Sequence, residues 1–337
     1  MKTVVKSIIL LIVLVLAACG SEEVTDQNES TNSNSSETLE TVLVGGRTGG
    51  AWSIFTEGIA ESIRRDNDGS IITVEPGGIV ENPVSVATNT IPYGLSYAMT
   101  AFAAYSGAEP YDQAYQDLRA ISVVIPANYY QFIVRAETEY NSVKEIIENE
   151  YPIRLSVDQK GSAGEIITRN ILKQYGVSYE DIISWGGTVD HLGGTKTFEL
   201  MADKRIDAAG DALSVPSSDI LEASTSIDLK LLSLEEDIAV SVAEDLGMLT
   251  GTIESGSYDF QYEEVTTVNT PVILIVNKDV SDEEVYKITE SIYNNFDYLS
   301  TVHEEFKNLT AENMADVGSV PLHSGAEAFY KDKGLLE

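Results

Sequence analysis

The sequence predicts a two-lobe α/β protein with a ligand cleft between its lobes. Strand-like and helix-like segments alternate along the chain, which indicates mostly parallel sheets. Two long extended segments, LRAISVVIPANYYQFIVRAE and YEEVTTVNTPVILIVNKD, divide the alternation into two sets. Each passes from an apolar strand through charged residues into a helix, so we interpret them as two crossover strands that join two sheets. A single large sheet is the alternative.

The first set begins with TVLVGG, which has the pattern of a strand followed by a glycine turn. In the next stretch, AWSIFTEGIAESIRRD, apolar residues recur every three or four positions, which predicts a helix. IITVEPGG then predicts a second strand and turn, IVENPVSVATN a short helix and IPYGLSYAM a buried strand. This set and a helix-rich C-terminal tail would form lobe one, residues 39–127 and 269–337.

The second set lies between the two crossover strands and would form lobe two, residues 128–268. Its predicted elements are, in order, the strand and turn IRLSVDQKGSAG, the helix EIITRNILKQYG, the strand IISWGG, the helix TKTFELMADKR, the short strand and turn IDAAGDAL and the strand LKLLSL. Because the two lobes repeat the same alternation, we expect the turns that follow their strands to face each other.

The N-terminus predicts export. After two lysines, an apolar run from Ile8 to Ala18 is shorter than the about 20 residues that span a bilayer, as in a signal peptide. Leu16-Ala17-Ala18-Cys19 resembles the lipobox of bacterial lipoproteins, which predicts a signal peptide at 1–18, lipidation at Cys19 and anchoring to the cell membrane. An ordinary secretory signal is the alternative. The polar stretch 19–38 predicts a disordered tether.

The composition excludes some partners. The formal net charge of −33 argues against nucleic-acid binding, and it means that an anionic ligand needs a local positive site. The acidic surface could suit a saline or alkaline exterior. Cys19 is the one cysteine of the sequence, so an intrachain disulfide or a cysteine metal cluster is impossible. We expect no cofactor and no metal.

Four glycine turns are the candidate ligand contacts: VLVGGRTGG, VEPGGIVEN, VDQKGSAGE and SWGGTVDHLGG. Turns at the carboxyl ends of parallel strands bind ligands in open α/β folds, so we expect all four at one cleft. The first turn matches neither the dinucleotide fingerprint nor the phosphate-binding loop of nucleotide hydrolases. A small carboxylate or phosphate fits better, because VDQKGSAGE offers a lysine, a hydroxyl and exposed N–H groups at a helix start.

Several candidates also have a purely structural interpretation. Arg47 could bind a carboxylate bidentately or point to solvent, and Trp52 could wall the cleft or pack in the core. Asn82 could bind ligand or cap its helix, and Asp211 could bind an amino group or belong to a turn. We expect Arg135 to be structural. The candidate ligand-binding residues are Arg47, Thr48, Gly49, Gly50, Trp52, Gly78, Asn82, Tyr97, Tyr129, Gln131, Lys160, Gly161, Ser162, Ala163, Gly164, Trp185, Gly187 and Asp211.

From Thr41 onward the chain resembles the TAXI group, the extracytoplasmic solute receptors associated with TRAP transporters. The resemblance is carried by GGRTGGAW, PGGIVENPVSVATNTIPYGLSY, FIVRAET, VDQKGSAGEIITRNIL and PLHSGAEAFYKDKG, in that order. Arg47, Asn82-Pro83 and Ser324 depart from the usual residues of the group, which leaves the ligand open.

The resemblance implies a type II periplasmic-binding-protein fold and delivery of solute to a TRAP membrane permease driven by an ion gradient. It implies small carboxylate ligands such as glutamate, glutamine or dicarboxylates. A receptor for an ATP-driven importer or a sensor kinase is the alternative within this class. A secreted hydrolase is the alternative outside it, although the sequence contains no H-E-x-x-H zinc motif and no G-x-S-x-G nucleophile elbow.

Overall fold

The computed structural model describes residues 38–337. The predicted signal peptide, the lipidation site Cys19 and the tether as far as residue 37 lie outside the described residues. Within residues 38–337, no helix is both long enough and apolar enough to cross a membrane.

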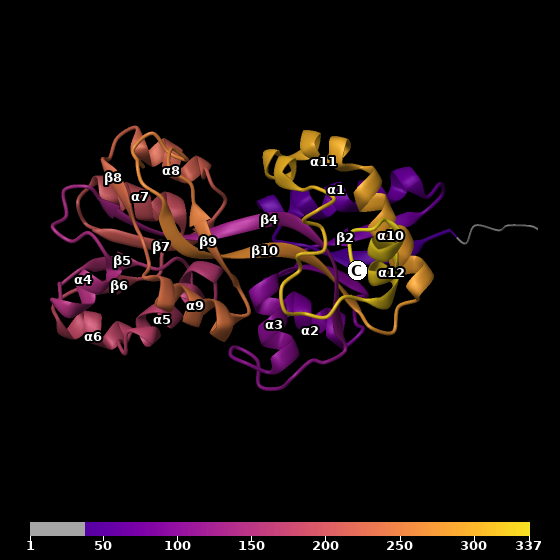
Figure 1. Ribbon diagram of the computed structural model, residues 1–337, viewed down its shortest axis with the longest axis horizontal. Helices are drawn as coiled ribbons and strands as arrows, with labels where there is room; N and C mark the ends of the chain where they lie inside the picture. The colour runs from indigo at the N-terminus through magenta and orange to yellow at the C-terminus, as the bar shows by residue number, and fades with distance from the viewer. Residues whose placement is uncertain (1–37) are drawn as a thin grey trace, which may run out of the picture. The chain divides into compact units, whose positions relative to one another are not determined.

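Ten strands share one hydrogen-bonded network in the order β2-β1-β3-β10-β4-β7-β5-β6, with β8 paired to β4 and β9 paired to β10 (Figure 1). The strands are β1 Glu40–Val44, β2 Ile71–Glu75, β3 Tyr93–Tyr97, β4 Leu118–Arg135, β5 Arg154–Ser156, β6 Thr188–Asp190, β7 Ala208–Leu213, β8 Leu229–Leu232, β9 Leu249–Ile253 and β10 Val265–Asn277.

The two long strands β4 and β10 are the crossover strands expected from the sequence, and they join two α/β lobes. β4 pairs with β10 between Leu118 and Tyr129, and then with β7 and β8. Among the named strands, parallel pairing is confined to β2-β1-β3 and β6-β5-β7, whereas β4 and β10 pair with other strands in the antiparallel sense. The sheets are therefore mixed rather than mostly parallel, and they are continuous through the crossover strands.

The pairing of β4 with β10 is irregular near its middle. The register shifts between Thr270 and Val272, on either side of Pro271, and the facing strand contains Pro126. Proline has no N–H group, so neither residue can donate a hydrogen bond to the ladder at this point.

The helices cover both faces of the sheets. They are α1 Ala51–Asp66, α2 Glu81–Ala87, α3 Ala98–Ser106, α4 Val143–Glu148, α5 Ala163–Gln174, α6 Tyr179–Ser184, α7 Gly194–Ala202, α8 Ser218–Ser224, α9 Glu236–Leu246, α10 Asp282–Asn294, α11 Phe296–Val302, η1 Glu304–Asn308 and α12 Ser324–Asp332. The apolar stripe predicted for α1 is confirmed, because Phe55, Ile59 and Ile63 are buried.

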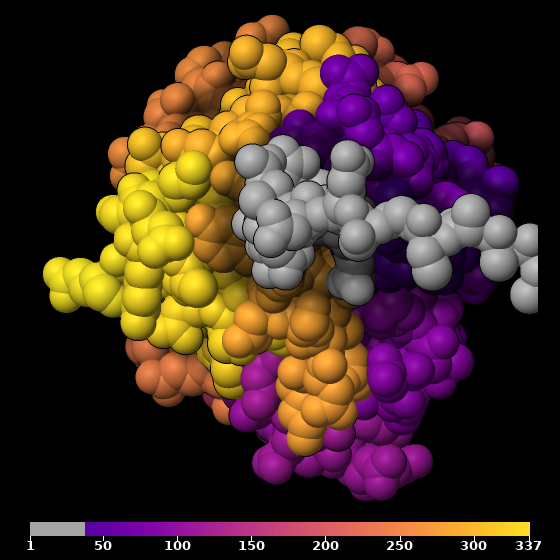
Figure 2. All heavy atoms as spheres, turned by 90° about the vertical axis from the view of Figure 1, so that its right-hand side faces the viewer, coloured from indigo at the N-terminus to yellow at the C-terminus, as the bar shows by residue number. Residues whose placement is uncertain are grey.

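The buried apolar residues separate into two main cores. The first core draws on residues 39–125 and 272–330, which we call the first half, and the second core draws mostly on residues 130–268, the second half. A smaller third cluster lies within the second half. Figure 2 shows one face of the first half, where the first described segment (indigo) and the C-terminal segment (yellow) lie on either side of orange residues.

Two sequence-based assignments in the second half were wrong. The stretch IISWGG is not a strand: Ser178 and Asp181 form a capping box that begins helix α6, and Ile182 is its buried residue. The glycine pair Gly186–Gly187 therefore precedes β6 instead of following a strand. Asp211 lies inside strand β7, opposite Gln131 of β4, and not in a turn.

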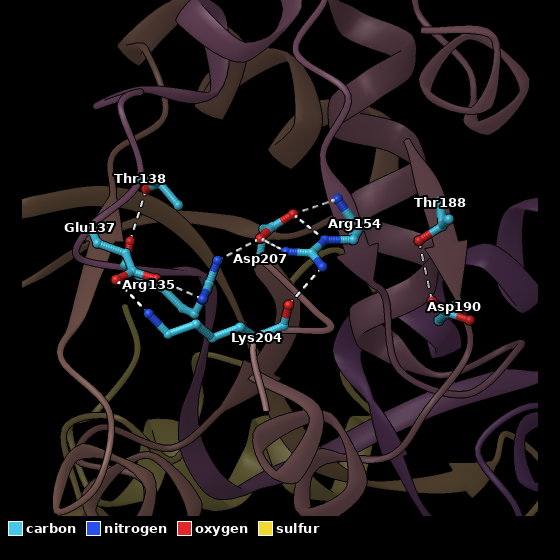
Figure 3. Close-up of polar contacts among 8 residues, drawn as sticks. All are labelled: Arg135, Glu137, Thr138, Arg154, Thr188, Asp190, Lys204 and Asp207. Carbon is cyan, nitrogen blue, oxygen red and sulfur yellow. Dashed lines mark hydrogen bonds and ion pairs between the residues drawn. The ribbon is translucent and has the colours of Figure 1, made fainter. Parts of the chain in front are cut away.

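Arg135, expected to be structural, ends β4 in an ion-pair network (Figure 3). It donates hydrogen bonds to Glu137 at 2.7 Å and to Asp207 at 2.8 Å. Arg154 of β5 also donates to both carboxylate oxygens of Asp207. Burial alone would raise the pKa of Asp207, but the two arginines outweigh it and hold this pKa below its usual value.

Candidate ligand-binding cleft

Three of the four predicted glycine turns meet at one cavity of about 410 Å³. The turn after β1, the turn after β2 and the turn after β5 each contribute to its wall. Its lining residues are Gly46, Arg47, Gly50, Ala51, Trp52, Gly77, Gly78, Ile79, Val80, Glu81, Asp158, Gln159, Lys160, Gly161 and Ser162. The first two turns belong to the first half and the third to the second half, so the cavity is a cleft between the halves.

The turn after β1 brings the start of α1 to the cleft. Gly46 is needed there because a Cβ at this position would lie 2.4 Å from the Cβ of Trp52. The N-cap of α1 is Gly50, which supplies no side-chain hydrogen bond, and the first turn of the helix contains no acidic residue. Gly50, Ala51 and Trp52 thus line the cleft at a helix start that has no capping side chain, and such a helix start favours an anion.

Asn82 holds the two turns of the first half together without lining the cleft. Its side chain is buried, and its amide nitrogen donates to the carbonyls of Gly45 and Leu95, both at 2.8 Å. Its Oδ1 accepts the N–H of Gly78 at 3.0 Å. Asn82 thus links the ends of β1 and β3 to the turn after β2, and its side chain is not among the lining residues of the cleft.

The turn after β5 presents Lys160, Gly161 and Ser162. Asp158 and Gly161 adopt left-handed backbone conformations, with φ of 61° and 77°. Ser162 is the N-cap of α5, and its hydroxyl accepts the N–H of Glu165. The helix cap and the ligand contact proposed for Ser162 are compatible, since its hydroxyl still has a proton to donate.

Two cationic side chains stand on opposite walls of the cleft. Arg47 comes from the first half and Lys160 from the second, and both are exposed. Within the described part of the chain, neither side chain takes part in an ion pair or a hydrogen bond. Glu81 and Asp158 also line the cleft. The two cations are therefore matched by two carboxylates in the lining, and the start of α1 adds the partial positive charge of a helix N-terminus.

Several carboxylates lie near Tyr97, which contacts Trp52 of the cleft. The rings of Trp52 and Tyr97 make an edge-on contact with centroids 4.9 Å apart. Burial raises the pKa of Tyr97, and the carboxylates of Asp211, Glu305 and Asp158 raise it further. Burial likewise raises the pKa of Asp211 well above its usual value, with a further contribution from Asp158. Asp158 belongs to this group of carboxylates and also lines the cleft, so negative charge adjoins the two cations.

Replacing Asp211 with asparagine is expected to stabilise the ligand-free protein at pH 7. The raised folded-state pKa means that the ionised carboxylate opposes folding, and asparagine retains the oxygen that accepts the N–H of Ala212. The gain should disappear below about pH 4, where the aspartate is protonated in both states. Thermal melting at both pH values tests this, with the exposed Asp68→Asn as a control; a lower melting temperature at pH 7 would contradict it.

The remaining candidate residues lie outside the lining of the cleft. Thr48 and Gly49 are exposed next to the lining residues, and Ala163 and Gly164 are buried at the start of α5, where a Cβ on Gly164 would lie 2.7 Å from Asp211. Gln131 is buried and accepts a hydrogen bond from Tyr258. The candidates that are not among the lining residues are Thr48, Gly49, Asn82, Tyr97, Tyr129, Gln131, Ala163, Gly164, Trp185, Gly187 and Asp211.

Two of these residues lie elsewhere for clear reasons. Tyr129 lines a separate cavity of about 330 Å³, with Ser214, Glu254 and Glu305, because its side chain alternates away along β4. Gly187 lies at the amino end of β6, packed so closely that a Cβ would lie 2.3 Å from the carbonyl oxygen of Ile153. Sequence reasoning missed other lining residues, among them Gly77, Glu81, Asp158 and Gln159, although each belongs to or adjoins a recognised turn.

The sequence also matches a family model. The model is that of the NMT1-like family, and the match extends over residues 43–334, which include the whole cleft. The chain belongs to the NMT1-like family.

Solved structures agree on the fold of this NMT1-like protein. It is similar to a TctC solute-binding protein from Polaromonas, with 16% identity, a TM-score of 0.51 and coverage of 88% of this chain and 97% of that one. It is similar to MatC from Rhodopseudomonas palustris with bound malate (14% identity, TM-score 0.52, coverage 89% and 99%). It is also similar to PhnD1 from Prochlorococcus marinus in complex with methylphosphonate (11% identity, TM-score 0.53, coverage 89% and 99%). The two-lobe fold expected from the sequence is the fold of these binding proteins.

Proposed function

We propose that the protein is an extracytoplasmic solute-binding lipoprotein of a TAXI-type TRAP transporter. It captures a small carboxylate, such as glutamate, glutamine or a dicarboxylate, and delivers it to the membrane permease. The observation that carries the proposal is the pair of free cations, Arg47 and Lys160, on opposite walls of one cleft beside the start of α1. The lipid anchor at Cys19 would keep the receptor at the membrane.

Binding would couple to a change in the angle between the lobes. In the proposed division, lobe one is 39–127 with 269–337 and lobe two is 128–268. A carboxylate that contacts both cations bridges the lobes, so it stabilises the closed arrangement by the contacts made only there. Arginine pairs bidentately with a carboxylate, and lysine adds a point charge. The similarity to proteins bound to malate and to methylphosphonate supports an anionic ligand.

The composition of the cleft favours a receptor over a hydrolase. No histidine is among its lining residues, and the hydroxyl of Ser162 accepts the N–H of Glu165 instead of facing a general base. A receptor for an ATP-driven importer or a sensor kinase would use the same cleft. Finding a gene for a multi-helix TRAP permease beside the gene for this protein would favour the TAXI assignment over these two.

The proposal is tested by screening ligands on the mature protein. Thermal shift and calorimetry with L-glutamate, L-glutamine, 2-oxoglutarate and C4 dicarboxylates should identify at least one compound that raises the melting temperature, because a ligand of the folded state stabilises it. Failure of all of these compounds, together with small phosphonates, would reject the assignment of an anionic ligand.

Lys160→Ala is expected to weaken binding of the best compound at least tenfold, or about 1.4 kcal/mol. The reason is the loss of one of two cations in the cleft. The matched control is Lys173→Ala, on the same helix region but paired with Asp245 outside the cleft. Calorimetry measures both affinities, and an unchanged affinity for Lys160→Ala would remove this residue from the site.

A further inference from the structure

Glu165 is a buried carboxylate one turn into α5, directly behind the cleft turn. Its Oε2 accepts the N–H of Gly161 at 3.3 Å, and its own N–H donates to the Ser162 hydroxyl at 3.2 Å. This reciprocal arrangement fixes the backbone that presents Gly161 and Ser162 to the cleft. Glu165 is not among the lining residues, so it contacts the cleft through this backbone alone.

Glu165 is also the first member of an ion-pair chain that crosses between the halves. Its Oε1 accepts Nε of Arg169 at 3.2 Å, and a terminal nitrogen of Arg169 lies 3.1 Å from the carboxylate of Glu109. Arg169 belongs to α5, whose Ile166, Ile167 and Ile171 pack in the second core. Glu109 lies in the segment between α3 and β4, two residues before Tyr111 of the first core.

We propose that Glu165 is a positioning residue for the cleft turn, and that Arg169 and Glu109 couple this turn to the separation of the halves. The inference rests on the proposed function, because it assumes that the turn after β5 contacts a solute. A change in the separation of the halves has to make or break the Arg169–Glu109 pair. Glu109 and Glu165 both pair with the guanidinium of Arg169, so a change at Glu109 alters how Arg169 holds the Glu165 carboxylate. The hydrogen bond from the Gly161 N–H to that carboxylate then changes as well.

The exposure of the three ion-paired residues fits a positioning role for Glu165 and a coupling role for Arg169 and Glu109. The side chain of Glu165 is 10% exposed, that of Arg169 is 48% exposed and that of Glu109 is 85% exposed. The buried end is suited to fixing the turn, since buried charges need their partners. The exposed end is weak and screened by salt, which suits a contact that forms and breaks repeatedly.

The coupling is tested without ligand by measuring the distance between the halves. Nitroxide labels at the exposed positions Lys307 and Glu222, introduced as cysteines in the mature protein with Cys19→Ser, report on the two halves. Glu109→Gln and Arg169→Gln should each shift or broaden the distance distribution. The double variant should change it no more than Arg169→Gln alone, because Arg169→Gln already removes the contact with Glu109 as well as that with Glu165.

Salt provides an independent check. Raising NaCl from about 0.05 M to about 0.5 M should change the distance distribution of the unaltered protein in the same way as the substitutions do. The distance distributions of the variants should not respond to salt. The control is Lys173→Gln, which removes an ion pair of α5 that stays within the second half. Unchanged distributions in both single variants would overturn the coupling, whether or not any solute binds.

The positioning role is tested by hydrogen exchange at the Gly161 amide. Glu165→Gln should accelerate this exchange at least threefold, Glu165→Asp less, and Glu109→Gln in the same direction by a smaller factor. Binding of L-glutamate, if the ligand screen shows that it binds, should weaken in the same order. If Glu165→Gln does not fold, exchange at Gly161 in Glu109→Gln, a change at an exposed side chain, still tests the positioning role. Exchange at Gly161 that is unchanged in Glu109→Gln and in either Glu165 variant would contradict the positioning role.

Discussion

Asp207→Asn is expected to lower the free energy of unfolding by about 3 kcal/mol at neutral pH, the size typical of a broken buried ion pair. Asp207 is 14% exposed and accepts hydrogen bonds from both Arg135 and Arg154. Asparagine keeps the shape but removes the charge, so Arg135, with a side chain only 11% exposed, loses its buried partner. Arg154 is 38% exposed, so solvent screening reduces its share.

The effect should depend on pH in a defined direction. The folded-state pKa of Asp207 is lowered, so its stabilisation is fully present above the unfolded-state pKa of about 3.9 and is lost as pH falls through the folded-state pKa. The stability difference between the unaltered protein and Asp207→Asn should therefore narrow below about pH 4. Urea unfolding between pH 7 and pH 3 measures it. The control is Asp190→Asn, whose carboxylate accepts one long hydrogen bond, 3.4 Å from Thr188.

Asn82→Ala is expected to cost about 3 kcal/mol of stability and to abolish tight ligand binding. The buried amide satisfies two carbonyls and one N–H, and each group left unpaired costs about 1–3 kcal/mol. The variant also unties the turn after β2 from the end of β1, which displaces two walls of the cleft.

Denaturant unfolding and calorimetry on the same preparation measure both consequences. Asn149→Ala is the matched control, because its amide is exposed and donates one hydrogen bond within its own helix end; we expect a change of no more than about 0.5 kcal/mol. An Asn82→Ala protein with unchanged stability and affinity would show that the three hydrogen bonds do not organise the cleft.

The sequence alone predicted the two-lobe architecture and three of the turns that line the cleft. The lengths and β-branched composition of β4 and β10 predicted the crossover strands, and the glycine turns after β1, β2 and β5 predicted three walls of the cleft. These are signals of local pattern: a strand, a turn that needs glycine and a helix start follow one another within about a dozen residues.

One of the parts that failed was decided by a local helix-start signal that outweighed the strand pattern, and the others depend on contacts between distant residues. SWGG resembles the other turns, yet the Ser178 capping box makes the preceding stretch helical and moves the glycines to the opposite end of a strand. Whether Asn82 faces a ligand or three backbone groups depends on β1 and β3 lying beside it. The side of β4 that Tyr129 occupies is set by strand register, which one sequence does not reveal.

The prolines in the middle of the crossover strands have a mechanical consequence. Pro126 and Pro271 lie near the point where β4 leaves β10 for β7, in a stretch where the register of β4 with β10 shifts at Thr270/Val272 and Val272/Ile273. The residues on either side pack into separate cores. Flexibility is thereby concentrated in a few backbone dihedral angles of β4 and β10, between the two packed cores. Opening and closing can then proceed as a bend at one joint, and neither core needs to repack when a solute arrives or leaves.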